Sequence, residues 1–183
     1  MAENLNYADS INYPGMKGRN WCYGNSLDRC AKYGRLYTWS AAMDSAGTFS
    51  TNGKVCGYNS YASPTYPVRG ICPSGWHLPT KAEFETLFTT VGGKTTAGKM
   101  LKATNGWNSD GNGTDAFGFS ALPAGDRVYN GNFDYGGYRA LFWSSSKATL
   151  GYAHSMYLTY GGDGAYLDVS DMRNGFSVRC IKD

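Results

Sequence analysis

Hydrophobic residues at helical spacing occur in two segments of the first half of the chain. In Thr38–Ala46, the residues Trp39, Ala42 and Met43 stand at positions i, i+3 and i+4, which line one face of a helix. Thr38 precedes them and has the side chain of a good N-cap. The pattern therefore predicts a helix over Thr38–Ala46.

The strongest helix signals lie in Lys81–Val91. Thr80 and Glu83 have the T-x-x-E spacing of a capping box, in which each side chain accepts a backbone N–H of the other residue. The apolar stripe of this segment consists of Phe84, Leu87, Phe88 and Val91. The glycines that follow end the helix. A third, shorter helix is expected over Ala97–Lys102.

From Asn105 onwards the pattern changes to short alternating runs separated by glycine. The runs are Phe119–Gly125, Leu141–Ser146, Tyr152–Tyr160, Ala165–Val169 and Gly175–Ile181. Alternation of this kind predicts antiparallel strands, and we expect the last strand to contain Val178. Helices first and strands afterwards indicate an α+β fold. A chain of 183 residues suits a single domain over residues 1–183.

Period-two alternation also sorts the residues of two strands into faces. In Ala165–Val169, Tyr166 and Asp168 are expected to face solvent and the other three residues to face the core. In the preceding run, one side would carry His154, Met156, Leu158 and Tyr160. Because this set is too mixed for a core face, we predict a β-bulge near Met156–Tyr157.

The composition of the chain argues against some classes of function. Charged residues make up 17% of the chain, whereas Gly (25 residues) and Tyr (15 residues) are abundant, as in a turn-rich domain with many amphipathic rings near its surface. The net charge is +3, but Lys and Arg do not cluster, so nucleic-acid binding is not expected. No apolar run reaches the about 20 residues of a membrane span, so membrane insertion is not expected. Residues 1–10 lack the pattern of a signal peptide.

The five cysteines are spaced for disulfides rather than for zinc, since only two histidines accompany them. Cys22 and Cys30 flank "YGNSLDR", a polar, turn-like loop that a disulfide could close. The second disulfide must use two of Cys56, Cys72 and Cys180. We favour Cys72–Cys180, which would tie an early segment to the last strand. A Cys56–Cys72 bond is the alternative, and in a reducing compartment all five would be thiols.

The stretch "CPSGWHLPTKAEFETL" (Cys72–Leu87) raises the question of catalysis. A Cys72 nucleophile with His77 as its base would need a third group to orient the base, and no sequence feature supplies one. We expect Cys72 in a disulfide and His77 as a hydrogen-bonding residue. The chain also lacks a G-x-S-x-G elbow, a P-loop and an H-E-x-x-H motif. Neither a metal ion nor a cofactor is expected.

Five ordered motifs resemble the Fibrobacter succinogenes major paralogous domain family: "GRLYTWSAAM", "CPSGWHLPTKAEF", "GFSALPAGDR", "FWSSS" and "GFSVRCIKD". The "HLPTKAEFE" and "GFSVRC" segments are also similar to formylglycine-generating-enzyme domains, and the terminal pattern to variable proteins of diversity-generating retroelements. This resemblance implies a C-type-lectin-like fold, with two main helices packed on short, mostly antiparallel strands. The formylglycine-generating group uses a pair of cysteines near its C-terminus, whereas this chain has only Cys180 there.

The resemblance and the tyrosine-rich last strands lead to a functional hypothesis. We expect a non-catalytic module that binds a protein or glycan on a cell surface, as a retroelement-diversified variable protein would. Tyrosine favours recognition because it supplies contact area at a low cost in conformational entropy. The expected ligand-binding residues are Tyr152, His154, Met156, Tyr157, Thr159, Tyr166, Asp168, Ser170 and Asp171.

Two other functions remain open at this stage. One is a formylglycine-generating-like or carbohydrate-active enzyme, and the other is a structural surface domain. The location expected for the favoured function is extracellular, on a cell or virion surface.

Overall fold

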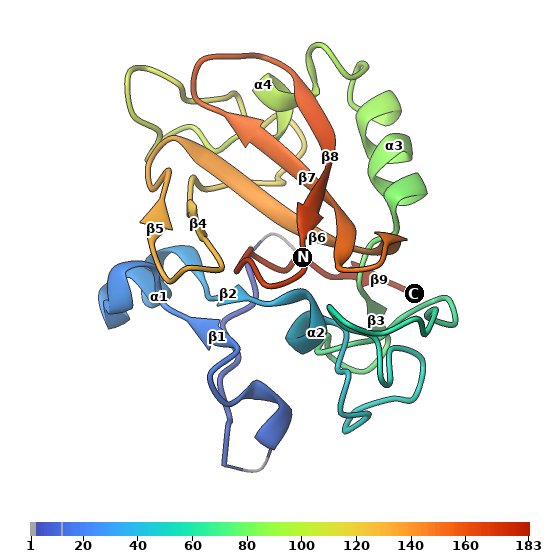
Figure 1. The fold of residues 1–183 in the computed structure, drawn as a ribbon. Coiled ribbons are helices and arrows are strands. Elements are labelled where there is room, and N and C mark those ends of the chain that lie inside the picture. The colour runs from blue at the N-terminus through green and yellow to red at the C-terminus, as the bar shows by residue number, and fades with distance from the viewer. Residues whose placement is uncertain (1–2, 12) are drawn as a thin grey trace.

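The computed structural model describes residues 3–11 and 13–183 as a mixed α+β structure (Figure 1). The helices are α1 (Leu27–Tyr33), α2 (Trp39–Ala42), α3 (Lys81–Thr90) and α4 (Ala97–Leu101), with 3-10 turns η1 (Pro14–Met16) and η2 (Tyr23–Asn25). The strands are β1 (Asn20–Trp21), β2 (Leu36–Tyr37), β3 (Trp76–His77), β4 (Asp126–Arg127), β5 (Phe133–Asp134), β6 (Arg139–Thr149), β7 (Tyr152–Thr159), β8 (Ala165–Asp171) and β9 (Ile181–Lys182). All pairs of these strands are antiparallel. Among the described residues, no helix has the length and apolar character needed to cross a membrane.

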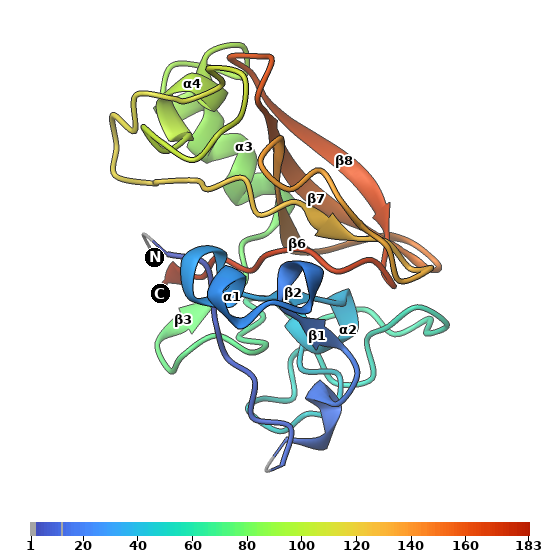
Figure 2. The same ribbon diagram turned by 90° about the vertical axis from the view of Figure 1, so that its left-hand side faces the viewer.

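The largest sheet has three strands in the order β6-β7-β8. Helices α3 and α4 lie against one face of it, which we call the inner face (Figure 2). Phe142, Met156 and Leu158 are fully buried there, in one cluster with Phe84 and Phe88 of α3. Figure 2 shows no described helix over the opposite, outer face. The sheet therefore uses one side for the core and leaves part of the other side open.

A second core closes the end of the sheet around Trp143 of β6. The Trp143 ring stacks on Phe176 with a centroid distance of 4.3 Å, and its indole N–H donates to the Tyr37 carbonyl at 2.7 Å. The Trp39 indole donates in the same way to the Ser144 carbonyl at 2.8 Å. These buried rings with satisfied N–H groups join the segment around α2 to the sheet.

The prediction of a helix after Thr80 is confirmed, including its capping box. The Thr80 hydroxyl accepts from the Glu83 backbone N–H at 3.2 Å, and the Glu83 carboxylate accepts from the Thr80 N–H at 2.7 Å. The helix predicted over Ala97–Lys102 is also present as α4, with Lys102 as its C-cap.

The helix predicted over Thr38–Ala46 forms, but α2 ends at Ala42. Its N-cap is confirmed, since the Thr38 side chain accepts from the Ala41 N–H. The early end has a local cause at Asp44, which has a positive φ of 53°. The Asp44 carboxylate accepts from the backbone N–H groups of the next segment, at Thr48, Phe49 and Ser50. This side chain supplies an alternative to helical hydrogen bonds.

Three other predictions about elements are wrong. The supposed loop between Cys22 and Cys30 contains η2 and the start of α1. The run Phe119–Gly125 forms no strand, because its pairings are two isolated bridges, from Ala121 to Lys102 and from Gly125 to Ala140. Val178 lies before the last strand β9, in a segment whose carbonyl accepts from the Leu5 N–H at 2.9 Å.

The prediction of a β-bulge near Met156–Tyr157 is wrong. Strand β7 pairs with β8 without interruption from Tyr152 to Leu158. The register shifts occur in β6, between Trp143 and Lys147 and again before Thr149. There Ser145 leaves the ladder, and its backbone N–H donates to the Pro79 carbonyl at 2.8 Å. The irregular strand thus holds the segment that leads into α3.

Both favoured disulfides are confirmed. Cys22–Cys30 has a Cα separation of 4.9 Å and Cys72–Cys180 one of 5.9 Å. The second closes a loop of 108 residues, which on the chain-entropy model stabilises the fold by about 4–5 kcal/mol. Cys56 is a buried free thiol, and burial raises its pKa.

Candidate functional site

The open part of the outer face is centred on a pair of tyrosines. Tyr157 of β7 is directly opposite Tyr166 of β8, and their rings stack with a centroid distance of 5.1 Å and an interplanar angle of 21°. Both rings are partly exposed. Cross-strand pairs of this kind fix the orientation of both side chains. The two tyrosines therefore form a rigid, accessible aromatic surface.

Polar residues surround this pair on the same face. Alternation places Thr159, Asp168 and Ser170 beside the tyrosines. The Asp168 carboxylate is exposed, and its one hydrogen bond within residues 3–11 and 13–183 comes from the adjacent Val169 N–H, at 2.8 Å. The Ser170 hydroxyl bonds to that of Ser155 at 2.9 Å. These five residues, Tyr157, Thr159, Tyr166, Asp168 and Ser170, make up what we call the tyrosine face.

The predicted solvent orientation of Tyr166 and Asp168 is thus confirmed. Val169 also lies on the expected inner side, opposite His154, but it is not part of the core, since it is 47% exposed. It lies near the end of β8, an edge strand of the sheet. Ala165, at the other end, is fully buried as expected.

Met156 is not a contact residue, contrary to the sequence prediction. Its side chain is fully buried on the inner face, in the cluster that contains Phe84 and Phe88. The alternation that placed His154, Met156 and Leu158 on one side was correct. The inference that His154 makes this side unsuitable for a core was wrong. Met156 and Leu158 are in the core, and His154 lies beyond its end, in a cleft.

His154 lies on the inner side of the sheet, in a cleft of about 490 Å³ beside α3. Lys81 and Glu85 of α3 line the cleft opposite it. Burial and the nearby Lys81 ammonium lower the pKa of His154, although a hydrogen bond with the Asp168 backbone acts in the other direction. His154 is therefore separated from the tyrosine face by the thickness of the sheet.

Tyr152 and Asp171 lie together at the far end of the sheet, paired across β7 and β8. Asp171 accepts from both the Nε and Nη2 groups of Arg173, at 3.0 and 2.6 Å. Although burial favours the neutral carboxyl, these bonds lower the pKa of Asp171. The Arg173 guanidinium in turn lies 4.1 Å from the Tyr58 ring centroid and 4.6 Å from that of Tyr129. Sequence reasoning missed this stack, whose members lie far apart in the chain.

The Cys72–His77 cluster has a structural role. Cys72 is bonded to Cys180, so its sulfur is not a thiol. The His77 ring is held between Asp183, 2.6 Å from Nδ1, and Glu83, 2.9 Å from Nε2. Burial opposes the charged ring, but the bonds to both carboxylates raise the pKa of His77. The expectation that His77 is a hydrogen-bonding residue is confirmed.

One buried carboxyl had no counterpart in the sequence analysis. Asp126 of β4 is buried, and its Oδ1 atom has no hydrogen-bond partner among the described residues. Burial, together with the nearby Asp134 carboxylate, raises the pKa of Asp126 to about 7. Within residues 3–11 and 13–183, no group of three or more His, Cys, Asp or Glu residues could hold a metal ion.

Comparison with known families supports the resemblance seen in the sequence. The family model of the Fibrobacter succinogenes major domain matches residues 1–182. The chain belongs to this family. No curated protein and no solved structure matches the chain. The name of the Fibrobacter succinogenes major domain states no activity.

Proposed function

We propose that this Fibrobacter succinogenes major domain is a non-catalytic recognition module whose tyrosine face binds a protein or glycan on a cell surface. The observation that carries the proposal is the stacked Tyr157–Tyr166 pair, partly exposed on a sheet whose inner face packs against α3. Interface hot spots are enriched in tyrosine, and a rigid aromatic pair loses little entropy on binding.

The two faces of β7 and β8 support a display function. The inner residues hold the strands to α3, so the exposed residues of the outer face can differ without loss of this core. A retroelement-diversified protein requires this separation of scaffold and ligand surface. In this proposal the diversified segment lies between Ala148 and Met172.

A C-type-lectin-like fold and an extracellular location are part of the same proposal. Two disulfides in one chain of this length favour an oxidising environment. The fold assignment rests on the motif resemblance and on the α+β arrangement with short antiparallel sheets.

The enzyme alternative has less support. The formylglycine-generating resemblance would require a reactive cysteine pair near the C-terminus, but Cys180 is bonded to Cys72. The free thiol of Cys56 is buried, and its raised pKa disfavours the reactive thiolate.

A two-part binding screen tests the proposal. The labelled domain is applied to a glycan microarray and to a displayed library of bacterial surface-protein fragments. The Tyr157→Ala/Tyr166→Ala double variant is screened in parallel. Tyr61→Ala is the matched control, because its ring is 84% exposed and lies outside the tyrosine face. We expect ligands that bind the wild type and the control but not the double variant, and that mass spectrometry recovers unchanged.

Two results would count against the proposal. Ligands retained by the double variant would place recognition elsewhere on the domain. The absence of any ligand in both screens would favour the structural alternative.

A further inference from the structure

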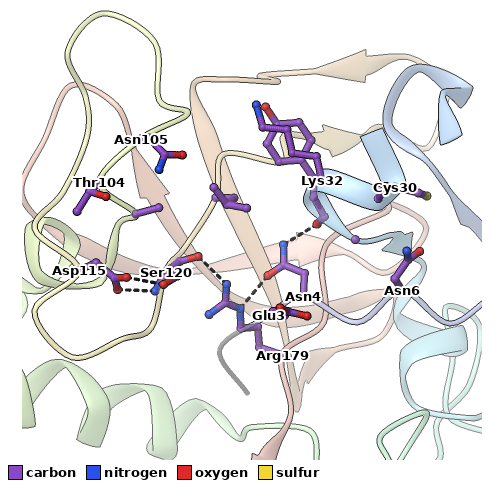
Figure 3. Close-up of a pocket in the computed structure, with 15 residues that line it drawn as sticks. Glu3, Asn4, Asn6, Cys30, Lys32, Thr104, Asn105, Asp115, Ser120 and Arg179 are labelled. Atoms are coloured by element: carbon purple, nitrogen blue, oxygen red, sulfur yellow. Dashed lines mark hydrogen bonds between the residues drawn. The ribbon is translucent and has the colours of Figure 1, made fainter. Parts of the chain in front are cut away.

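A separate cavity of about 520 Å³ lies away from the tyrosine face (Figure 3). Four segments that are distant in sequence form it: residues 3–6, the end of α1, residues 103–122 and Arg179. Its volume lies within the range of about 300–1,000 Å³ that is usual for small-ligand sites. Most such sites are lined mainly by apolar groups, whereas charged, amide and hydroxyl side chains predominate here.

One wall of the cavity is a continuous hydrogen-bonded network. The Asp115 carboxylate accepts from the backbone N–H of Ser120 at 2.6 Å and also from its hydroxyl. The Ser120 carbonyl accepts from Arg179 Nη2 at 2.9 Å, and Arg179 Nε donates to the Asn4 side-chain oxygen at 2.8 Å. Arg179 is only 3% exposed. The wall is therefore fixed before any ligand binds, which reduces the entropy cost of binding.

The rim of the cavity carries five polar side chains, one of which, Lys32, has its ammonium 5.0 Å from the Tyr33 ring centroid. They are Glu3, Asn6, Lys32, Thr104 and Asn105. All five are exposed, and none makes a side-chain hydrogen bond or ion pair within the described part of the chain. Figure 3 shows Thr104 and Asn105 on one side of the view and Lys32 and Asn6 on the other, with Ser120, Arg179 and Asn4 between them. A fixed wall is thus bordered by groups free to bind.

We propose that this cavity binds a small neutral saccharide. Two amides and one hydroxyl dominate the free groups, and each can both donate and accept a hydrogen bond. A sugar hydroxyl has the same dual character, so a polyhydroxylated ligand can satisfy all of them. Glu3 accepts hydroxyl donors and Lys32 donates to hydroxyl oxygens, and their charges cancel.

A simple anion fits the cavity less well. The guanidinium of Arg179 already donates to three neutral oxygens, those of Asn4, Phe119 and Ser120. The Glu3 and Asp115 carboxylates would repel a second negative charge. The site is independent of the tyrosine face, so it can exist whether or not the proposed function is correct.

Titration of the full chain with free monosaccharides and disaccharides, followed by ¹H–¹⁵N NMR, tests the proposal. Amino acids and inorganic phosphate are titrated as comparison ligands. We expect at least one neutral sugar to shift the backbone signals of Gly34, Ala103 and Thr104 in a saturable way. Asn105→Ala should weaken this binding at least about fivefold, since it removes a hydrogen-bonding group.

Asn59→Ala is the matched control, because Asn59 is an exposed amide outside the cavity. The control and the Tyr157→Ala/Tyr166→Ala variant should bind the sugar as the wild type does. The proposal is overturned if no sugar shifts the cavity signals, or if the shifts map to the tyrosine face. It is also overturned if amino acids or phosphate bind there in preference to every sugar.

Discussion

The inner and outer faces of the β6-β7-β8 sheet are built from alternate residues of the same strands, yet they differ in almost every property. On the inner face, Met156 and Leu158 are fully buried beneath α3. On the outer face, Tyr157 and Thr159 are partly exposed and carry hydroxyl groups. This difference shows how a single strand, β7, can contribute both to the core and to a proposed recognition surface. Substitutions on the two faces should therefore affect different measurements.

The largest effect is expected from Met156→Ala on the inner face. It removes a fully buried side chain from a packed cluster, and such truncations cost about 2–5 kcal/mol of unfolding free energy. Urea denaturation of the variant and the wild type measures the difference. A loss below about 1 kcal/mol would show that the inner face is not the rigid support described here.

A smaller loss is expected when the helix that covers the inner face loses its cap. Thr80→Ala removes one half of the capping box, which costs about 1 kcal/mol. Thr86→Ala is the matched control, since Thr86 is an exposed residue of the same helix and should change stability by no more than about 0.5 kcal/mol. Equal effects of the two variants in thermal unfolding would contradict the role given to the cap.

The tyrosine face should contribute less to stability than the inner face. Tyr166→Ala removes one stacked ring, a contact worth about 0.5–1.5 kcal/mol, and leaves the inner cluster intact. Thermal unfolding should show a smaller decrease than for Met156→Ala. A decrease as large as that of Met156→Ala would mean that the two faces do not have separate roles.

The helix prediction succeeded where the sequence signal lay within a few consecutive residues. The disulfide prediction succeeded because the five cysteines allow few pairings. The capping box of Thr80 and Glu83 needs only four consecutive residues, and Cys72–Cys180 was one of few possible bonds. Helix α1 was missed because its apolar pattern is sparse: Leu27 is 75% exposed, and only Cys30 and Tyr33 are buried.

The parts that sequence could not supply depend on contacts between distant segments. Lys102 is 2% exposed, and its ammonium donates to the carbonyls of Thr159 and Gly162, more than 50 residues away. Arg179 is buried in a similar way by residues about 60 positions earlier. A lysine or arginine in a sequence gives no sign of such partners. The register shift in β6 and the burial of Met156 likewise depend on how α3 covers the sheet.

The two histidines should give opposite and smaller effects on stability as pH changes. The pKa of His77 is raised in the fold, so its contribution is fully present below the unfolded pKa of about 6.5 and is lost as pH rises through the folded value. The pKa of His154 is lowered, so the folded state loses stability as pH falls below about 6.5 towards the folded value. NMR titration of both rings, with His77→Asn and His154→Asn as references, checks the two directions. Titration of His77 below His154 would contradict both assignments.

The measurement that tests the central claim most directly is the affinity of the tyrosine-face variants for a ligand selected by the wild-type domain. Dissociation constants are measured for the wild type, Tyr157→Ala, Tyr166→Ala and the exposed control Tyr61→Ala. At least one of the two stacked tyrosines should behave as a hot spot, with a loss of about 2 kcal/mol, which is about 30-fold in affinity. The control should remain within about twofold. Unchanged affinity in both tyrosine-face variants would contradict the assignment of this face as the recognition surface.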